Sequence, residues 1–324
     1  MTILIGEVEE KMTTQKRITI VGAGLMGIGI AQVFASYGCE VFLVDMNKDQ
    51  LNKVPGTVLG ILENFSRYGV EFSDSDEKIL ARIKTTRDIE EACKGCDFVF
   101  EAVFENMELK RKIVADLDRF CDLETVICSN TSVMSITEIA TKAEHKERIL
   151  GTHWWNPPHL IPLVEVVRTK ETFLACADAT FDLLKEVGKK PIHVNKDVPG
   201  FVANRLQHAL WREAFALIDN EVCDIATVDE AIKSSFGMRL PALGPVENAD
   251  MVGLDLTFAI HDYLLKHLTN SSEPSQFLKD SVDKGNLGFK TGQGFLSWTE
   301  EEIETSRSHL SNYLLETVSE KNKS

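Results

Sequence analysis

Short apolar runs alternate with helically spaced apolar residues along the N-terminal part of the chain. Arg17–Gly22 and Glu40–Asp45 are compact apolar runs that predict buried strands, and Leu25–Tyr37 between them predicts a helix. Further strands are predicted at Asp97–Val103, Thr125–Asn130, Ile149–Trp154, Val164–Arg168 and Pro191–Val194, with helices at Met107–Phe120 and Glu171–Val187. Apolar strands separated by helices are typical of a parallel sheet that is covered on both faces. The pattern therefore predicts an α/β, doubly wound sheet.

The pattern changes in two places. Between Asn47 and Asp88, charged and apolar residues mix at helical spacing, which predicts a helical excursion from the sheet. After Val198-Pro199-Gly200 the strand pattern ends, and apolar residues have helical spacing from Phe201 to Val222 and in several segments as far as Leu315. Proline and glycine commonly punctuate elements. We therefore predict an all-helical C-terminal domain at residues 198–324, with a polar end at 316–324 that frays.

The charge balance limits the possible partners. The chain has 35 Lys and Arg against 50 Asp and Glu, a net charge of 35 − 50 = −15, whereas a protein that binds nucleic acid needs a basic face. No apolar run approaches the roughly 20 residues that span a bilayer. We therefore expect neither a nucleic-acid partner nor a membrane.

The first sixteen residues are acidic. They carry Glu7, Glu9 and Glu10 and lack the basic start of a signal peptide. We interpret residues 1–16 as a short arm ahead of the first strand, and the sequence leaves open whether Met1 or Met12 is the start.

The seven cysteines indicate a reducing environment. Their number is odd and their spacing irregular, which argues against a disulfide framework and favours the cytoplasm. Cys93 and Cys96 form a C-x-x-C pair, but the second pair that a zinc ribbon needs is missing. We expect no metal site.

A glycine motif lies between the first predicted strand and helix. Gly22-Ala23-Gly24-Leu25-Met26-Gly27 has the form G-x-G-x-x-G, in which glycines permit a tight turn and bring the pyrophosphate of a dinucleotide to a helix N-terminus. Asp45 follows Gly24 by 45 − 24 = 21 residues, at the end of the second strand. There it can accept hydrogen bonds from ribose hydroxyls and repel the extra phosphate of NADP. The motif predicts an NAD-binding Rossmann domain at residues 17–197, with NADP as the alternative because Lys48 is near.

A histidine and a glutamate suggest the chemistry. His153 lies at the end of a predicted strand, where the strands of such a sheet line the ligand crevice. Histidine as a residue type suits the role of general base, because an imidazole titrates near neutrality. Glu165 lies in the apolar stretch Leu163–Val167, where an acid is costly unless it is paired. A buried glutamate that faces the histidine would orient its ring. On spacing alone, a core histidine and an unrelated acid remain an equal alternative.

Five further motifs occur in a fixed order and give the sequence a specific resemblance. With the glycine loop, the chain from its first strand to about Trp298 resembles the L-3-hydroxyacyl-CoA dehydrogenase family. The motifs are Ser129-Asn130-Thr131-Ser132, His153-Trp154-Trp155-Asn156-Pro157, Leu163-Val164-Glu165-Val166, Pro199-Gly200-Phe201-Val202-Ala203-Asn204-Arg205 and Lys290-Thr291-Gly292-Gln293-Gly294-Phe295. The family commonly has two phenylalanines where this chain has Trp154 and Trp155, which we expect to alter the shape of the pocket more than the chemistry.

The resemblance implies roles for individual residues. His153 would be the general base and Glu165 its partner, while Ser132 and Asn204 would hold the substrate oxygens. Four more positions match family positions near the cofactor, namely Glu105, Lys110, Asn156 and Lys290. The helical C-terminal domain of the family forms a dimer interface, so the resemblance also implies a homodimer.

Arg239 opens a second hypothesis about the substrate. It stands in Phe236–Pro241, and a similar Gly-Met-Arg occurs in relatives that act on free hydroxy acids, such as the lambda-crystallin-like gulonate dehydrogenases. A guanidinium can bind a carboxylate with two parallel hydrogen bonds, although a surface arginine is an equal alternative. The segment expected to flank a CoA tail, Asn64–Glu77, offers only Arg67 against four acids, with Lys78, Arg82 and Lys84 following.

The sequence thus leaves three functions to compare. The leading one is NAD-dependent oxidation of an L-3-hydroxyacyl-CoA to the 3-ketoacyl-CoA, which belongs to fatty acid metabolism. The second keeps the chemistry but takes a free 3-hydroxy acid, with Arg239 on its carboxylate. The third is a non-catalytic, structural or binding protein on this fold, which would be expected to have lost one of His153, Glu165, Ser132 and Asn204.

Overall fold

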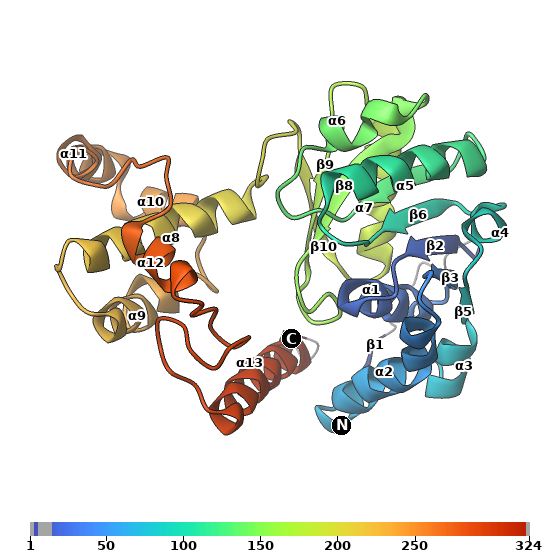
Figure 1. The fold of residues 1–324 in the computed structure, drawn as a ribbon, viewed down its shortest axis with the longest axis horizontal. Coiled ribbons are helices and arrows are strands. Elements are labelled where there is room, and N and C mark those ends of the chain that lie inside the picture. Colours follow the sequence, from blue (N-terminus) through green and yellow to red (C-terminus); the bar gives the residue numbers. More distant parts are fainter. Residues whose placement is uncertain (1–2, 6–14, 322–324) are drawn as a thin grey trace. The chain divides into compact units, whose positions relative to one another are not determined.

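A computed structural model describes residues 3–5 and 15–321 of the chain. The chain divides into two compact units (Figure 1). The first comprises Met1–Asn204 together with Leu310–Ser324, and the second comprises Arg205–His309.

An eight-stranded sheet forms the centre of the first unit. Its strands lie in the order β10-β9-β8-β7-β6-β2-β3-β5. Their bounds are β2 Arg17–Val21, β3 Glu40–Val44, β5 Ile83–Thr86, β6 Phe98–Glu101, β7 Val126–Ser129, β8 Ile149–Trp154, β9 Leu163–Val167 and β10 Lys190–Val194. All neighbouring strands are parallel except β8 and β9, which are antiparallel. The parallel sheet that the sequence predicts has one antiparallel pair here, because residues 155–162 are too few for a helical crossover and the chain turns back.

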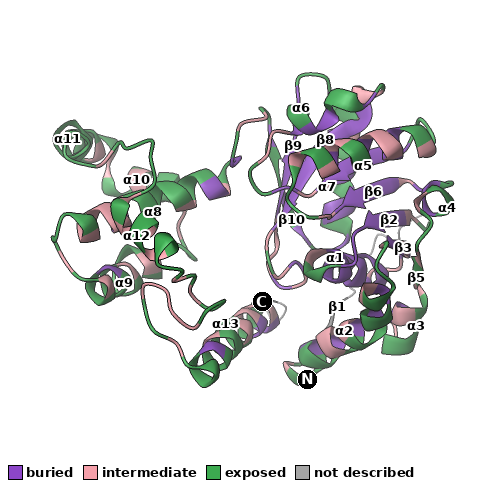
Figure 2. Cartoon of the chain, viewed as in Figure 1, coloured by how far each residue is buried: buried purple, intermediate pink, exposed green. Residues whose placement is uncertain are grey.

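Helices cover both faces of the sheet, which confirms the doubly wound α/β prediction. One face packs against α1 (Leu25–Ser36), α2 (Lys48–Arg67) and α7 (Leu174–Glu186). The other packs against α4 (Ile89–Cys93), α5 (Met107–Phe120) and α6 (Ile136–Ile139), beside the short 3-10 turns Ala140–Lys142 and Lys146–Arg148. Along β6, Phe98 and Phe100 face the first layer and Val99 the second, as strand alternation requires. Figure 2 shows the strands at the centre of this unit largely buried.

The segment between Asn47 and Asp88 contains two strands that the sequence did not predict. It forms α2, β4 (Val70–Phe72), α3 (Asp76–Ala81) and β5. The predicted helical excursion is correct for α2 and α3, but β5 pairs with β3 and extends the sheet. Neither end of β5 is buried and its middle is exposed, so it lacks the continuous apolar run of a central strand.

The N-terminal arm also contains a strand. Ile3–Ile5 forms β1, which pairs in parallel with β4 in a separate two-stranded sheet. The residues on which the acidic arm and the alternative start were argued, Glu7, Glu9, Glu10 and Met12, lie outside the described residues.

The second unit is helical, as predicted. It contains most of α8 (Ala203–Asp219), then α9 (Ile225–Lys233), a 3-10 turn at Phe236–Met238, α10 (Pro245–Val252), α11 (Leu254–Leu264) and α12 (Gln276–Asp283). Three rings form a small aromatic cluster, with centroids 5.4 Å apart for Phe215 and Phe295 and 4.3 Å for Phe277 and Phe295.

The last helix, α13 (Glu300–Lys321), ends in the first unit. Leu315 is buried there in a cluster with Phe65, Val70 and Leu160. The expectation of a frayed end is therefore wrong as far as Lys321, and residues 322–324 lie outside the described part. The sequence had placed residues 310–324 in the C-terminal domain, whereas their contacts group them with the sheet.

No helix within the described ranges is long and apolar enough to cross a membrane.

Candidate active site

His153 and Glu165 face each other from neighbouring strands. They are directly paired in the antiparallel register of β8 and β9, so their side chains point to the same face of the sheet. The Nδ1 atom of His153 lies 2.6 Å from Oε2 of Glu165, and the residues are 4% and 0% exposed. The antiparallel turn that departs from the predicted topology is thus what brings the two side chains together.

The second carboxylate oxygen of Glu165 accepts hydrogen bonds from the backbone at the start of α8. Its Oε1 accepts hydrogen bonds from the backbone N–H groups of Val202, at 2.9 Å, and Ala203, at 3.1 Å. Burial raises the pKa of Glu165, but the hydrogen bonds from His153 and from these two N–H groups outweigh it and hold the pKa below its usual value. The carboxylate is therefore kept ionised beside the imidazole.

Aromatic side chains enclose the His153 ring. The Trp155 ring centroid lies 5.1 Å from it and that of Phe201 lies 5.8 Å away. Phe201 is buried and adopts a positive φ of 49°, a backbone conformation that is uncommon for a bulky residue. The turn before α8 thus shapes one wall of the site and supplies the N–H groups that bind Glu165.

Ser132 and Asn204 are held next to each other. The amide Nδ2 of Asn204 donates to the backbone oxygen of Ser132 at 2.9 Å. Ser132 is exposed in the loop after β7, and its backbone N–H donates to Oε1 of Glu105 at 2.9 Å. Because Asn204 directly follows the N–H groups that bind Glu165, one network links these residues to the His153 pair.

Lys110 lies beneath this loop and is fully buried. Its Nζ is 2.8 Å from Oε1 of Glu101 and 3.4 Å from Oε2 of Glu105, and it donates to the backbone oxygen of Asn130 at 3.1 Å. The resemblance implies that Lys110 lies near the cofactor. Its side chain is 0% exposed, so its ammonium does not reach the surface. Its contacts instead hold the loop that carries Ser132.

The glycine motif has the close packing that its residues suggest. Gly22 has a positive φ of 109°, and a Cβ on Gly27 would lie 1.8 Å from the backbone oxygen of Gly22. Gly24 begins α1 without a side-chain cap, and a Cβ there would meet no atom within 4 Å. The first turn of α1 therefore presents backbone N–H groups to open space, which suits the phosphates of a dinucleotide.

Asp45 is fixed at the end of β3. Its Oδ2 accepts from the N–H of Ala23 and its Oδ1 from the N–H of Asn47, both at 2.8 Å. Each oxygen keeps a lone pair for another donor. The glycine loop and this carboxylate together fit the phosphates and ribose of NAD.

Two sequence profiles match nearly the whole length of the chain. The profile of the 3-hydroxyacyl-CoA dehydrogenase NAD-binding domain matches residues 17–198, and that of the 3-hydroxyacyl-CoA dehydrogenase C-terminal domain matches residues 200–298. The chain belongs to the 3-hydroxyacyl-CoA dehydrogenase family. Its cofactor is NAD, as the glycine motif and Asp45 predicted.

Relatives of this dehydrogenase family differ in the substrates that their names give. The chain is 34% identical to the human mitochondrial hydroxyacyl-coenzyme A dehydrogenase, over 87% of this chain and 91% of the relative. It is 31% identical to 5-formyl-3-hydroxy-2-methylpyridine 4-carboxylate 5-dehydrogenase of Mesorhizobium japonicum, over 89% of this chain and 92% of the relative.

The solved structures to which the chain is similar also include both kinds of dehydrogenase, those named for a CoA thioester and those named for a pyridine carboxylate. A crystal structure of a 5-formyl-3-hydroxy-2-methylpyridine 4-carboxylic acid 5-dehydrogenase matches with a TM-score of 0.88 and 28% identity, over 96% of this chain and 99% of the other. The (S)-3-hydroxybutyryl-CoA dehydrogenase of Ralstonia eutropha matches with a TM-score of 0.73 and 34% identity, over 89% and 100%. The chain is therefore an NAD-dependent oxidoreductase of this family.

The remaining residues that the sequence predicted for the site lie in both units. Asn156 is exposed two residues after the end of β8 in the first unit. Lys290 and Arg239 belong to the second unit, and both are exposed there. Lys290 precedes a turn in which Thr291 Oγ1 donates to the backbone oxygen of Gln293 at 2.8 Å.

Sequence reasoning missed Glu101 and the N–H groups of Val202 and Ala203. Glu101 is 0% exposed, and its oxygens accept from Lys110, at 2.8 Å, and from Ser129 Oγ, at 2.5 Å. The signal that singled out Glu165, an acid in an apolar strand, is equally present in Phe98–Glu101. The two N–H groups carry no side-chain signal, so they could be found only from the structure.

The cysteine pair has no ligand geometry. Cys93, the last residue of α4, and Cys96 are buried free thiols in the core cluster that also contains residues of α5. Across the residues that the structure describes, no group of three or more His, Cys, Asp or Glu side chains could hold a metal ion.

Proposed function

We propose that this protein oxidises the 3-hydroxyl of an L-3-hydroxyacyl-CoA to the 3-ketoacyl-CoA with NAD, using His153 as general base and Glu165 as its partner. The observation that carries the proposal is the buried contact of 2.6 Å between His153 Nδ1 and Glu165 Oε2. A neutral histidine held in this way has one tautomer and one orientation.

The proton would move at the other nitrogen of the ring. Because Glu165 engages Nδ1, Nε2 is left to accept the proton of the substrate hydroxyl. Glu165 then stabilises the positive imidazolium that results. Bound NAD would supply the acceptor for the hydride, so the alcohol loses one proton and one hydride and becomes a ketone.

Other residues would position the reactants. Ser132 and Asn204, which are joined at 2.9 Å, would hold the substrate oxygen in reach of His153. Gly22 to Gly27 and Asp45 would bind the dinucleotide, and Glu105, Asn156 and Lys290 would lie near it. Lys110 is enclosed by Glu101 and Glu105, so its role in this proposal is to position the loop of Ser132.

A free carboxylate substrate is the second candidate, and the surface charges favour it. The basic residues in and directly after the segment expected to flank a CoA tail already have acidic partners. Within the segment Arg67 pairs with Glu63, and after it Lys78 and Arg82 pair with Asp74 and Lys84 with Glu40. Little positive charge is left there for the phosphates of CoA.

Two further observations agree with this second candidate. Arg239 is exposed, as a residue that clamps a substrate carboxylate must be. One of the relatives is named for a substrate that bears a carboxylate.

A kinetic comparison separates the two substrates. NADH formation would be followed with L-3-hydroxybutyryl-CoA, with longer L-3-hydroxyacyl-CoA esters and with free 3-hydroxy acids including L-gulonate, for the wild type, Arg239→Ala and the exposed control Lys233→Ala. The first proposal expects a higher kcat/KM for the thioesters and little effect of Arg239→Ala. The second expects the free acids to be preferred, with a loss of about tenfold or more in Arg239→Ala alone.

We also propose that the enzyme works as a homodimer in the cytoplasm. Helix α11 exposes apolar side chains along its length, among them Leu254, Phe258 and Tyr263, and a helix that is apolar on several sides is normally covered.

The cytoplasmic location is argued from the cysteines. All seven cysteines are free thiols, which is typical of a reducing compartment. Retention of free thiols in the purified protein would be checked by alkylation, and a native disulfide would contradict the location.

A further inference from the structure

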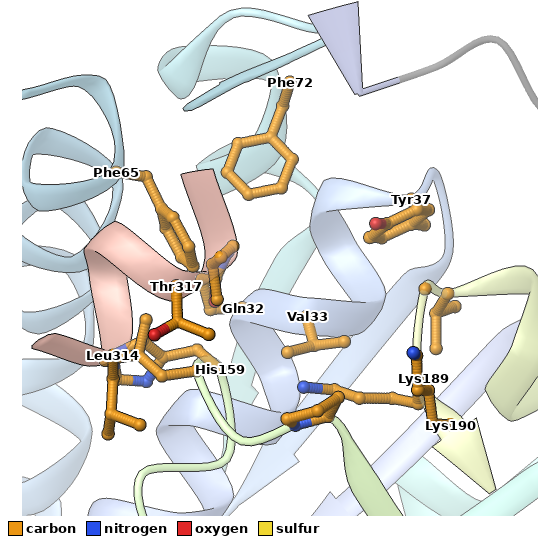
Figure 3. Close-up of a pocket in the computed structure, with 15 residues that line it drawn as sticks. Gln32, Val33, Tyr37, Phe65, Phe72, His159, Lys189, Lys190, Leu314 and Thr317 are labelled. Atoms are coloured by element: carbon orange, nitrogen blue, oxygen red, sulfur yellow. The ribbon is translucent and has the colours of Figure 1, made fainter. Parts of the chain in front are cut away.

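A cavity lies in the first unit, and its lining contains no residue of the glycine loop. Figure 3 shows its lining, which comes from α1, α2, β4, the β8–β9 connection, the start of β10 and the end of α13. Its volume is about 430 Å³, within the range of small-molecule sites and far more than one water needs. Much of the wall is apolar and aromatic, and it includes Val33, Tyr37, Phe65, Phe72 and, on α13, Leu314.

Two polar atoms in this lining have no hydrogen-bond partner. Gln32 is 1% exposed, and its Nε2 donates to Ser36 Oγ at 2.8 Å, but its Oε1 is buried without a partner. The Nδ1 atom of His159 is also buried and unpartnered. Buried polar groups are rarely left unpaired, because each costs about 1–3 kcal/mol. These two atoms are therefore free to bind a polar group in the cavity.

The third polar group is a buried lysine without an ionised partner. Lys189 is 8% exposed. Its ammonium donates to the backbone oxygens of Pro158 and Ile161 and lies 5.4 Å from the centroid of the Trp154 ring. Its contacts among the described residues are thus with backbone oxygens and an aromatic ring, and no carboxylate lines the cavity. Burial lowers the pKa of Lys189 to about 7, because the ammonium is removed from water and no carboxylate in the lining offsets this.

The residues that line the cavity indicate which chemical groups a ligand would need. A lysine ammonium has three N–H donors, and two of those on Lys189 are used by backbone oxygens. Lys190 is a second lysine in the lining, and the lining includes no aspartate or glutamate. A carboxylate would give Lys189 the anionic partner that it lacks, and an apolar body would fill the aromatic wall.

We propose that this cavity is a second small-molecule site, which binds a carboxylic acid with a short aliphatic or aromatic body, the carboxylate at Lys189 and the body against Val33, Phe65 and Phe72. Gln32 Oε1 and His159 Nδ1 would bind polar groups of the ligand or waters held by it. The site is distinct from the one that contains His153 and the glycine loop.

The cavity is nevertheless joined to the catalytic strands. Lys189 holds the oxygens of Pro158 and Ile161, both in the connection between the strand of His153 and the strand of Glu165. Pro158 in turn packs against α1, since a Cβ on Gly29 would lie 2.6 Å from Pro158 Cγ. An occupant of the cavity would therefore contact the residue that fixes this connection.

Calorimetric titration of the full chain tests the proposal. The probes are hexanoate and 3-phenylpropionate, with hexanamide as the uncharged match for hexanoate. The variants are Lys189→Met, which removes the charge, and Thr317→Phe, which fills the cavity from α13 and keeps the lysine. Lys185→Met, at an exposed lysine on α7, is the matched control. Arg239→Ala removes the other residue proposed to bind a carboxylate.

We expect at least one of the two acids to bind, and hexanamide to bind more weakly than hexanoate. Affinity should fall about tenfold or more in Lys189→Met and in Thr317→Phe, and should stay unchanged in Lys185→Met and Arg239→Ala. Thermal unfolding of each variant establishes that it is folded. The proposal is overturned if neither acid binds the wild type, if both cavity variants bind as the wild type does, or if only Arg239→Ala loses binding. Loss of binding in Arg239→Ala alone would place the acids at the substrate site. That result overturns the cavity proposal without contradicting the proposed function.

Discussion

At the scale of single residues, the site depends on carboxylates that are held by several hydrogen bonds. Glu165 binds His153 through one oxygen and the start of α8 through the other. Glu101 binds Lys110 and Ser129 in the same way. A buried carboxylate with such partners keeps its neighbours in one orientation. The unusual position of an acid inside an apolar strand is therefore a usable signal of a positioned group.

Asp45 gives a prediction about cofactor choice. We propose that its carboxylate binds the ribose of NAD, where it would repel the extra phosphate of NADP. Asp45→Ala should lower kcat/KM for NAD by roughly tenfold and raise the relative use of NADP. Asp49→Ala, an exposed acid in the first turn of α2, is the control. An unchanged ratio of kcat/KM for NAD and NADP in Asp45→Ala would contradict the assignment.

At the scale of elements, close packing at the start of α1 makes two glycines of one motif unequal. A Cβ on Gly27 would lie 1.8 Å from the backbone oxygen of Gly22, whereas a Cβ on Gly24 would meet no protein atom within 4 Å. Gly27 is thus needed by the fold, whereas the space beside Gly24 is open to a ligand.

Gly27→Ala and Gly24→Ala should therefore fail in different ways. Gly27→Ala should destabilise the protein by roughly 1–3 kcal/mol or more, because the backbone must move. Gly24→Ala should change stability by less than about 0.5 kcal/mol but weaken NADH binding, because the pyrophosphate approaches the backbone there. Urea unfolding and NADH fluorescence titration measure the two effects. Equal stability of the two variants would refute this distinction.

The same scale shows what the sequence could predict. The central strands and α5 were predictable because their apolar runs and helical spacing are continuous. β5 was not, because an edge strand such as Ile83–Thr86 is half exposed and partly polar. The antiparallel pairing of β8 and β9 was within reach, since residues 155–162 cannot hold a crossover helix. The hydrogen bonds from the start of α8 to Glu165 could not be predicted, because backbone N–H groups leave no signal in the sequence.

At the scale of the whole molecule, the two units differ in how well they bury apolar side chains. The first has a sheet with a hydrophobic core on each face. In the second, α11 has no buried residue, and Phe258 and Tyr263 are 75% and 72% exposed. A partner surface is needed to cover these side chains, and a second copy of the chain is the partner that the family resemblance suggests.

Light scattering on the purified chain tests the dimer. We expect twice the mass of one chain for the wild type and a shift toward the monomer for Phe258→Asp, because a buried charge without a partner is costly. Leu123→Asp, at an exposed leucine of the first unit, should leave the mass unchanged. A monomeric wild type at micromolar concentration would contradict the homodimer.

The most direct test of the central claim is the rate of hydride transfer in a single turnover with His153→Gln, using the best substrate of the kinetic comparison. The account predicts that the rate falls by about 10²–10⁴-fold, that NADH binds with unchanged affinity, and that Glu165→Gln gives a smaller loss in the same step. A rate in His153→Gln within a few-fold of the wild type would show that His153 is not the base and that the contact with Glu165 is structural.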